Sequence, residues 1–515
     1  MGRLIIILFV LFSSLCKPIH AALIDTYIEY YQEQLFYPEI TQRLYNDDTL
    51  KWKSPLARKY LENQLALLAL AQLNDSVTAR YYQLQGMDGV EYDILATDTL
   101  IYLRTYQSSV SAKGKKWFFG GRIEASLPKP QPETIKGITK AIEERDLVSF
   151  THALRPSSDQ YEELYQRLFH YYQPYEDSES VFIKERLIRP NQLTDVNAII
   201  YRLQVSGEIN HQEADMLLRQ SNDHYDSSLV LIIKEFQKRH GLKQDGIIGP
   251  KTLHWLNMTA KERVRIMALN IQRLRLWENK NSNFVLVNIP SYEMAYWQEG
   301  ELVFTSKVIV GKPERRTPIF TTRLNAIVFN PEWKVPTKIM REDILPKALN
   351  NKDFLQSQNF EIIPTWLSKE VISIDDIDWE QVNVETFPYK LKQKSGNTNA
   401  LGRYKFNTPN RNAIYLHDTP SRSLFSKQHR AYSSGCIRVE KASEFAQLLM
   451  KESHFSTQDY KDYHELPETS KVSLDQQISV YTIYQTSWVG EDNQVQFRMI
   501  YTNTMNGVKV EIDKN

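Results

Sequence analysis

The chain has 515 residues, of which 42% are hydrophobic and 24% are charged, and its formal net charge is +1. This length predicts two to four domains, because a single hydrophobic core rarely grows to such a size. The near-neutral charge excludes a general electrostatic attraction to nucleic acid or to an anionic membrane surface, although a local basic patch stays open.

The N-terminus has the pattern of a secretory signal peptide. Arg3 precedes the apolar run 4–12, the small residues Ser13 and Ser14 follow it, and the segment ends with Ala21 and Ala22. The run is short for a membrane span. We therefore expect residues 1–21 to be removed when the protein is exported to the periplasm. Retention as an inner-membrane anchor is the alternative.

The cysteine count restricts the chemistry of the mature chain. The sequence contains only Cys16 and Cys436, and Cys16 lies inside the predicted signal peptide. A mature chain with one thiol cannot form an internal disulfide bond. This count alone leaves open whether Cys436 is a buried inert thiol or a reactive one.

The first half of the mature chain reads as helical and carries no catalytic cluster. Residues 22–190 predict a helical scaffold, with Leu61, Leu65 and Leu68 on one helical face. Residues 191–260 predict a small separate module, in which an amphipathic helix ends at Gly241 and Pro250 opens another helix. A linker helix over 261–282 is expected to follow.

From residue 283 the hydrophobic pattern changes to a period of two, which predicts a β-rich domain over 283–505. An insert with a helical start at 339–349 is expected over 337–394, and 506–515 reads as a tail. The expected strands are 284–289, the hairpin 292–297 with 302–310, 325–329, 412–416, and 478–488 paired with 495–501. The fold class is therefore multidomain α+β.

Two short motifs near the end of this domain carry the chemistry. His417 ends a predicted strand, and Gly435 and Cys436 follow after a loop. A nucleophilic cysteine needs a base or a cation nearby, and His417 is the candidate. The backbone N–H groups of Gly435 and Cys436 are candidates to hold an oxyanion. A helix is expected directly after Cys436, and its N-terminus would favour the thiolate.

The spacing of these residues also allows other interpretations. Cys436 and His417 could form a metal site with His429 or Asp418, although no second cysteine supports one. His417 could also be a purely structural histidine.

The pattern His-x-Thr followed by Ser-x-Gly-Cys-x-Arg resembles the L,D-transpeptidases of the YkuD fold, the ErfK/YbiS/YcfS/YnhG group. Further matching stretches begin at Val310, Asn330 and Asn399. The run from Phe236 to Thr252 resembles a peptidoglycan-binding module of the three-helix type. The order of a helical scaffold, this module and a catalytic domain with a lid-like insert is similar to the YcbB branch.

The resemblance implies an exported cysteine acyltransferase that forms 3→3 cross-links in peptidoglycan. Cys436 would attack the third residue of a tetrapeptide stem, release the terminal D-Ala and form a thioester. His417 would accept the thiol proton, the backbone carbonyl of Asp418 would orient its ring, and the hydroxyl of Tyr415 would join the oxyanion donors. No metal or cofactor is implied. The partners would be stem peptides and glycan, with other cell-wall synthesis enzymes as further candidates and no nucleic acid, and carbapenems would acylate Cys436.

Four more residues are candidates for substrate contact. Ser434 stands where the wider family has histidine. Arg438 is a candidate for a substrate carboxylate or for a structural tie, and Trp333 and Tyr404 are candidates for the cleft lining or for the core.

Two alternatives to the transpeptidase stay open. The same site could serve a carboxypeptidase, an exchange of D-amino acids or the attachment of a wall protein, because groove shape selects the acceptor. The alternative of another class is a peptidoglycan-binding protein without catalysis.

Overall fold

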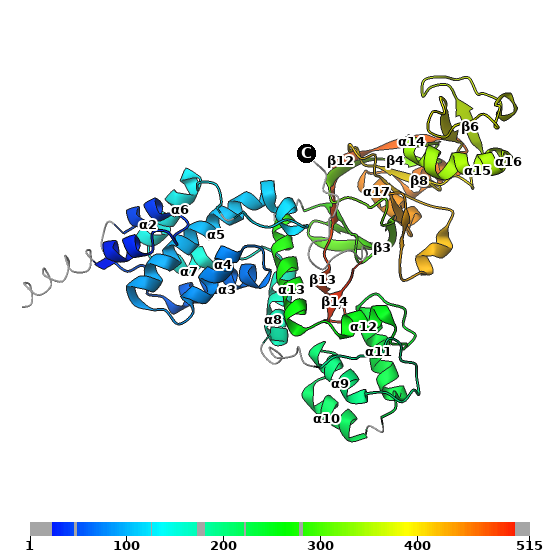
Figure 1. The fold of residues 1–515 in the computed structure, drawn as a ribbon. Helices are drawn as coiled ribbons and strands as arrows, with labels where there is room; N and C mark the ends of the chain where they lie inside the picture. Colours follow the sequence, from blue (N-terminus) through cyan, green and yellow to red (C-terminus); the bar gives the residue numbers. More distant parts are fainter. Residues whose placement is uncertain are drawn as a thin grey trace, which may run out of the picture. The chain divides into compact units, whose positions relative to one another are not determined.

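The computed structural model describes residues 23–45, 49–124, 126–172, 181–220, 223–277 and 282–499. The expected signal peptide and C-terminal tail lie outside these residues. The chain forms two compact units (Figure 1). The first holds the described residues up to 277 together with Thr486–Phe497, and the second holds those from 282 to Gln485. Among the described residues, no helix combines the length and the apolar character needed to cross a membrane.

The N-terminal part of the first unit is the helical scaffold. Asp98 on its longest helix is buried, accepts hydrogen bonds from the backbone N–H of Phe36 and Tyr37, and pairs with Arg80 at 2.8 Å. These contacts hold the segment that precedes α2 against the longest helix of the scaffold. The helices are α2 (Pro38–Arg43), α3 (Pro55–Leu70), α4 (Asp75–Leu84), α5 (Gly89–Phe118), α6 (Pro132–Glu143), α7 (Leu147–His152) and α8 (Asp159–Tyr172).

The small module follows in the same unit. The Gln237 side chain accepts a hydrogen bond from Gly246 N and donates one to Ile247 O, which fixes the glycine-rich turn before the last helix. The helices are α9 (Val196–Val205), α10 (His211–Gln220), α11 (Ser227–Arg239) and α12 (Pro250–Leu256).

Two segments near the expected domain boundaries belong to the first unit. The helix expected as a linker is α13 (Ala260–Leu274), continued by η2 (Arg275–Trp277), and it belongs to the core of the first unit. Its Arg273 is buried and donates a hydrogen bond to Phe118 O. This carbonyl of α5 supplies the partner that a buried guanidinium group requires. The C-terminal hairpin β13 (Ser487–Val489) and β14 (Val495–Phe497) also joins this unit, where the Phe497 ring stacks 5.7 Å from His240.

The second unit is built on a nine-stranded sheet in the order β10-β3-β11-β9-β8-β4-β12-β1-β2. Because β3 also pairs with β2, the sheet closes on itself. Its strands are β1 (Phe284–Asn288), β2 (Glu293–Gln298), β3 (Glu301–Gly311), β4 (Thr321–Phe329), β8 (Tyr404–Asn407), β9 (Leu416–His417), β10 (Ala431–Ser433), β11 (Ile437–Val439) and β12 (Ser470–Ile483).

Two strands differ from expectation. Residues 412–415 precede β9 without strand structure, because Ala413 takes a φ of 52° that breaks an extended backbone. The segment expected at 478–488 is divided: residues up to Ile483 belong to β12, which pairs with β4 and β1, and only Ser487 and Trp488 pair with β14 as expected. The apolar residues of its first part are therefore used in the closed sheet.

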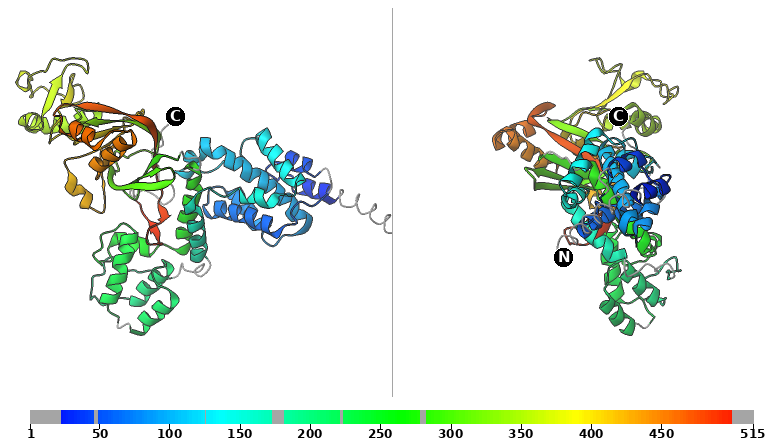
Figure 2. Two further views of the ribbon diagram at one scale, coloured as in Figure 1. Left: turned by 180° about the vertical axis from the view of Figure 1, so that it is seen from behind. Right: turned by 90° about the vertical axis from the view of Figure 1, so that its left-hand side faces the viewer.

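One helix covers the core face of the closed sheet. The Phe445 ring of α17 (Ala442–Glu452) lies 5.2 Å from Phe304 and 4.9 Å from Phe406, and α18 (Thr457–Glu465) follows it. The two views of Figure 2 show α17, in orange, against the strands. The short η5 (Arg422–Ser426) lies in the loop between β9 and β10.

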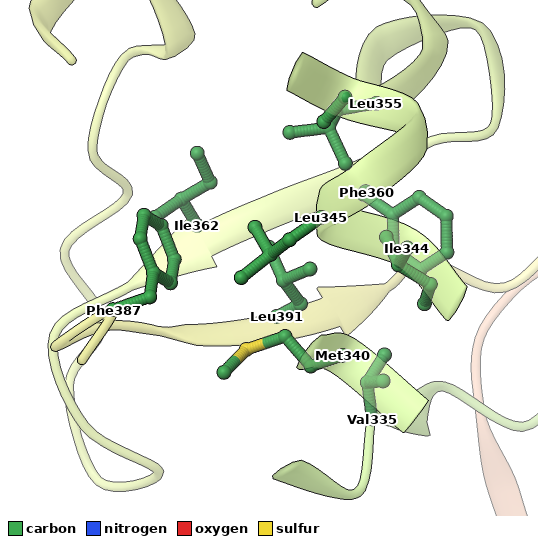
Figure 3. Packing of buried hydrophobic residues seen from close by; sticks show 10 residues of the cluster. Val335, Met340, Ile344, Leu345, Leu355, Phe360, Ile362, Phe387 and Leu391 are labelled. Carbon is green, nitrogen blue, oxygen red and sulfur yellow. The ribbon is translucent and has the colours of Figure 1, made fainter. Parts of the chain in front are cut away.

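The insert is a folded subdomain with a core of its own. Figure 3 shows Leu345 in the middle of this core, between the helical segments and two strands that carry Ile362 and Leu391. The helical start was correctly expected. The elements are β5 (Trp333–Lys334), α14 (Thr337–Ile339), the π-helix η3 (Met340–Ile344), α15 (Leu345–Asn350), α16 (Asp353–Ser357), β6 (Phe360–Ile363), η4 (Ile374–Asp376) and β7 (Lys390–Gln393), with a sheet order of β5-β7-β6.

Candidate active site

The parallel pairing of β9 with β11 brings the two motifs together. Leu416 lies opposite Ile437 and His417 opposite Arg438, and Ile437 N donates to Tyr415 O at 3.0 Å. Side chains alternate along a strand, so Leu416 and Ile437 point into the core. Tyr415, His417, Cys436 and Arg438 therefore share the opposite face.

Cys436 is half-buried on this face, and its Sγ lies 3.8 Å from Ala413 O. No hydrogen bond joins it to His417 in the part of the chain that the structure describes. Such contacts are often long in unliganded enzymes and shorten when substrate binds. Burial raises the pKa of the Cys436 thiol, while the N–H and the hydroxyl of Tyr415 and the charges of Lys405 and Arg438 oppose this shift.

The expected activation of Cys436 by a helix N-terminus is wrong. The residue is followed by β11, and α17 begins only at Ala442. The field of a helix dipole falls off within about one turn of its end. The charges near the thiol must therefore come from side chains on the sheet.

His417 is buried and held in one orientation. Its Nδ1 lies 2.6 Å from Asp418 O, and because a carbonyl only accepts, Nδ1 carries the proton. Burial, with a further contribution from the Arg438 charge, lowers the pKa of His417 to about 3. The ring is therefore neutral at pH 7, with Nε2 free of a proton and able to act as a base.

The Asp418 carboxylate holds the peptide that orients His417. One carboxylate oxygen accepts from Arg403 N at 2.9 Å and the other from Arg422 Nη2 at 2.9 Å. Gly402 lies against this carboxylate, and a Cβ at Gly402 would lie 2.4 Å from Asp418 Oδ2. The Gly402 position therefore allows the close approach that fixes Asp418.

Tyr415 places a hydroxyl beside the thiol. This hydroxyl is in hydrogen-bonding reach of the Trp333 side chain and of Cys436, and burial raises its pKa. The rings of Tyr415 and His417 meet edge to face with centroids 5.7 Å apart. Trp333 comes from β5 and also packs on the core of the insert. The insert thus contributes a side chain to the candidate site.

The loop before Cys436 is rigid, and it corrects one expectation. Gly435 has a φ of 116°, a conformation that only glycine adopts readily. Its N–H donates to Ser433 Oγ at 3.1 Å, and its carbonyl accepts from Thr317 Oγ1 at 2.7 Å. The Gly435 N–H is therefore already used and is not a free oxyanion donor in this conformation.

The remaining candidates separate into two groups. Ser434 and Arg438 lie at the site: Ser434 Oγ accepts from Arg315 Nη1 at 2.8 Å, and Arg438 shares the face of Cys436. Tyr404 does not lie at the site. Its side chain is buried on the opposite face of β8, where its hydroxyl lies 2.7 Å from His464 Nδ1 of α18. The prediction that Tyr404 lines the cleft is wrong, and its alternative role in the core holds.

Sequence reasoning missed Lys405. Its neighbours Tyr404 and Phe406 are buried, and the pairing of Lys405 with His417 places it on the face of Cys436. The signal was a single lysine between two aromatic residues in a strand, which by the period of two must point away from the core.

Cys436 and His417 do not belong to a cluster that could bind a metal ion. In the ranges that the structure describes, no group of three or more His, Cys, Asp or Glu side chains is arranged to hold an ion. His429 lies outside the face of Cys436, with its ring 5.8 Å from those of Tyr292 and Tyr432.

Three family models match the chain. Residues 282–466 match the YkuD L,D-transpeptidase catalytic domain, 40–168 match a scaffold domain, and 212–256 match a domain described as a proposed peptidoglycan-binding domain. The chain therefore carries an L,D-transpeptidase catalytic domain of the YkuD type and a peptidoglycan-binding domain. The more specific assignment to the YcbB branch stays a prediction.

A curated Haemophilus influenzae protein, described as a proposed L,D-transpeptidase, is 38% identical over 235 residues, which are 46% of this chain and 47% of the relative. The chain thus matches about half the length of that relative.

Two solved structures were also found. The L,D-transpeptidase from Mycobacterium smegmatis is 14% identical with a TM-score of 0.19, and L,D-transpeptidase 1 of Mycobacterium tuberculosis is 11% identical with a TM-score of 0.16. Each match covers 39% of this chain, and 58% and 61% of the two structures respectively.

Proposed function

We propose that this protein is an exported L,D-transpeptidase that forms 3→3 cross-links in peptidoglycan, with Cys436 as the nucleophile. The observation that carries the proposal is the common face of β9 and β11, on which Cys436, His417 and Tyr415 lie together in a catalytic domain of this class. The peptidoglycan-binding domain would hold the enzyme on its polymeric substrate.

In the first step the sulfur of Cys436 attacks the carbonyl carbon of the third stem residue. The thiol proton passes to Nε2 of His417, whose ring is held by Asp418 O. The amide bond to the terminal D-Ala breaks, and the released amine takes the proton from His417. The products are a thioester on Cys436 and free D-Ala. The Tyr415 hydroxyl is the candidate donor to the oxyanion that forms between these stages.

In the second step the side-chain amine of another stem attacks the thioester. His417 takes a proton from this amine, the carbon–sulfur bond breaks, and the sulfur of Cys436 regains a proton. A new amide bond joins the two stems. The His417 ring is neutral before each attack, so its unprotonated nitrogen can accept the proton.

The test is incubation with a carbapenem and, separately, with disaccharide tetrapeptides, followed by mass spectrometry. We expect one carbapenem adduct per wild-type chain, none on Cys436→Ala, and a 3→3 dimer with release of D-Ala. A tripeptide without the dimer would indicate that water is the acceptor and that the protein is a carboxypeptidase. Absence of both the adduct and any product would contradict catalysis and favour the wall-binding alternative.

A further inference from the structure

A row of three side chains, a lysine, a histidine and an arginine, crosses the site from strand to strand. Lys405 on β8 lies opposite His417 on β9, and His417 lies opposite Arg438 on β11. All three point to the face that carries Cys436 and Tyr415, because facing residues of paired strands project to the same side of a sheet. Two permanent cations thus flank the histidine and the thiol.

Lys405 is half-buried and has no carboxylate partner. Its Nζ lies 4.4 Å from the centroid of the Tyr415 ring. No ion pair joins Lys405 to an acidic side chain among the described residues, and the opposite charge that acts on it is that of ionised Cys436. Burial, opposed by Cys436 and assisted by the nearby charge of Lys334, lowers the pKa of Lys405. An ammonium group in such a place costs stability, which suggests a role in the reaction.

Arg438 is in the same situation. It is half-buried, its Nε has no hydrogen-bond partner among the described atoms, and ionised Cys436 is the opposite charge that acts on it. Neither cation is neutralised by the protein, so both fields act on the reacting sulfur.

His417 cannot replace them as the counter-ion of a thiolate. Its pKa is lowered to about 3, so the ring is uncharged at neutral pH. The charges of Arg438 and Lys405 contribute to that lowering, because they oppose an imidazolium, whereas they favour a thiolate. The proton of Cys436 can pass through His417, but the negative charge on sulfur needs another partner.

We propose that Lys405 is a positioning residue of the site, whose ammonium group stabilises the thiolate of Cys436 by its charge and also contacts the Tyr415 ring, whose hydroxyl reaches Cys436. Lys405 keeps its proton throughout, and no bond to it forms or breaks. The proposal rests on the proposed function only in taking Cys436 as the reacting group.

The groups that face Cys436 are identified for each element around it. They are Tyr415 directly before β9, His417 from β9, Lys405 from β8 and Arg438 from β11, with Lys334 of β5 acting on Lys405. Of these, Lys405 is the one whose replacement leaves the strand pairing, the His417 orientation and the nucleophile loop in place.

The test measures alkylation of Cys436 by iodoacetamide from about pH 5.5 to 9.5, with peptide mapping to separate Cys436 from Cys16. The variants are Lys405→Met and Lys405→Arg. The matched control is Lys471→Met, which removes a lysine from the same sheet face two strands away, across Val328. Circular dichroism checks that each variant is folded.

Removal of one adjacent opposite charge shifts a pKa by about one unit or more. We therefore expect Lys405→Met to slow alkylation at pH 7 about tenfold and to move the midpoint of the profile up by about one pH unit. Lys405→Arg should restore most of the rate, and Lys471→Met should behave as the wild type. A folded Lys405→Met variant with the wild-type profile would overturn the proposal, as would an equal shift in Lys471→Met.

The two proposals fail separately. Slower alkylation in Lys405→Met, together with a wild-type protein that makes no cross-link, would leave this inference standing and remove the proposed function. A cross-linking wild type with an unchanged Lys405→Met profile would do the reverse.

Discussion

The buried neutral state of His417 predicts a large acid sensitivity of the catalytic unit. The imidazole titrates at 6.5 in an unperturbed chain and at about 3 in the folded protein. Between these values the unfolded chain binds a proton that the folded protein does not. Stability is therefore fully present above pH 6.5 and is lost as the pH falls, by about 1.4 kcal/mol per pH unit for this one group.

The expected magnitude follows from the same two values. Between pH 8 and pH 5 the contribution of His417 to the free energy of unfolding falls by about 2 kcal/mol. His417→Gln places a neutral amide at the position, and this variant should lose about 2 kcal/mol less than the wild type over that range. His429→Gln is the matched control, because His429 is an exposed histidine of the same unit, and it should follow the wild type.

The assay must read the sheet unit separately, because a protein with two units need not unfold in one step. Urea unfolding followed by pulsed hydrogen exchange meets this need when it reports on peptides that contain β9 and β11. Equal pH dependence in the wild type and His417→Gln would refute the reasoning. So would a ring resonance of His417 that titrates near its ordinary value.

Three further predictions concern the loop, the hydroxyl and the insert. Gly435→Ala should fold but cost about 1–3 kcal/mol, because φ is 116° there and the new Cβ would meet Ile414 Cδ1 at 3.0 Å, and carbapenem acylation followed by intact mass should slow about tenfold. Tyr415→Phe should reduce the acylation rate about a hundredfold with little change in carbapenem binding, and an unchanged rate would exclude Tyr415 as an oxyanion donor. Arg315→Met should increase hydrogen exchange in the π-helix at Met340–Ile344, because Arg315 joins Asp343 at 3.0 Å and Ser434 at 2.8 Å. The control Lys352→Met, which removes an exposed ion pair with Asp375, should not change exchange in that helix.

The Arg315 contacts connect the lid-like insert to the loop that carries Cys436. The insert has its own core, and Arg315 holds its Asp343 next to Ser434, the residue that precedes Gly435. Faster carbapenem acylation in Arg315→Met would support a gating role. A slower reaction in a variant with the same hydrogen exchange as the wild type would instead place Arg315 among the groups that shape the nucleophile loop.

Much of the architecture was readable from local patterns. The period-two runs at 292–297 and 302–310 correctly predicted the hairpin of β2 and β3, and Pro250 correctly marked the start of α12. The short motifs around His417 and Cys436 indicated the class of the catalytic domain, which the family match to 282–466 supports. These signals are local, because turn residues and alternation act over a few neighbouring positions.

Errors arose where long-range packing decided the outcome. The helix expected as a linker became part of a core, and the 478–488 segment was divided between a sheet strand and a hairpin in the other unit. Lys405 shows the same limit at a single residue, since alternation turns it away from the core but does not say that β8 pairs with β9 and places Lys405 opposite His417.

The sequence by itself determined the kinds of groups present: one thiol outside the predicted signal peptide, a histidine after a strand, and a glycine where the chain must turn. The tertiary structure alone decided how those groups act. Strand pairing placed Lys405 and Arg438 beside Cys436, burial made His417 neutral, and a neighbouring serine took the Gly435 N–H. The physical reason is that charge, protonation and hydrogen-bond capacity depend on which atoms surround a group, and those atoms come from strands far apart in the chain.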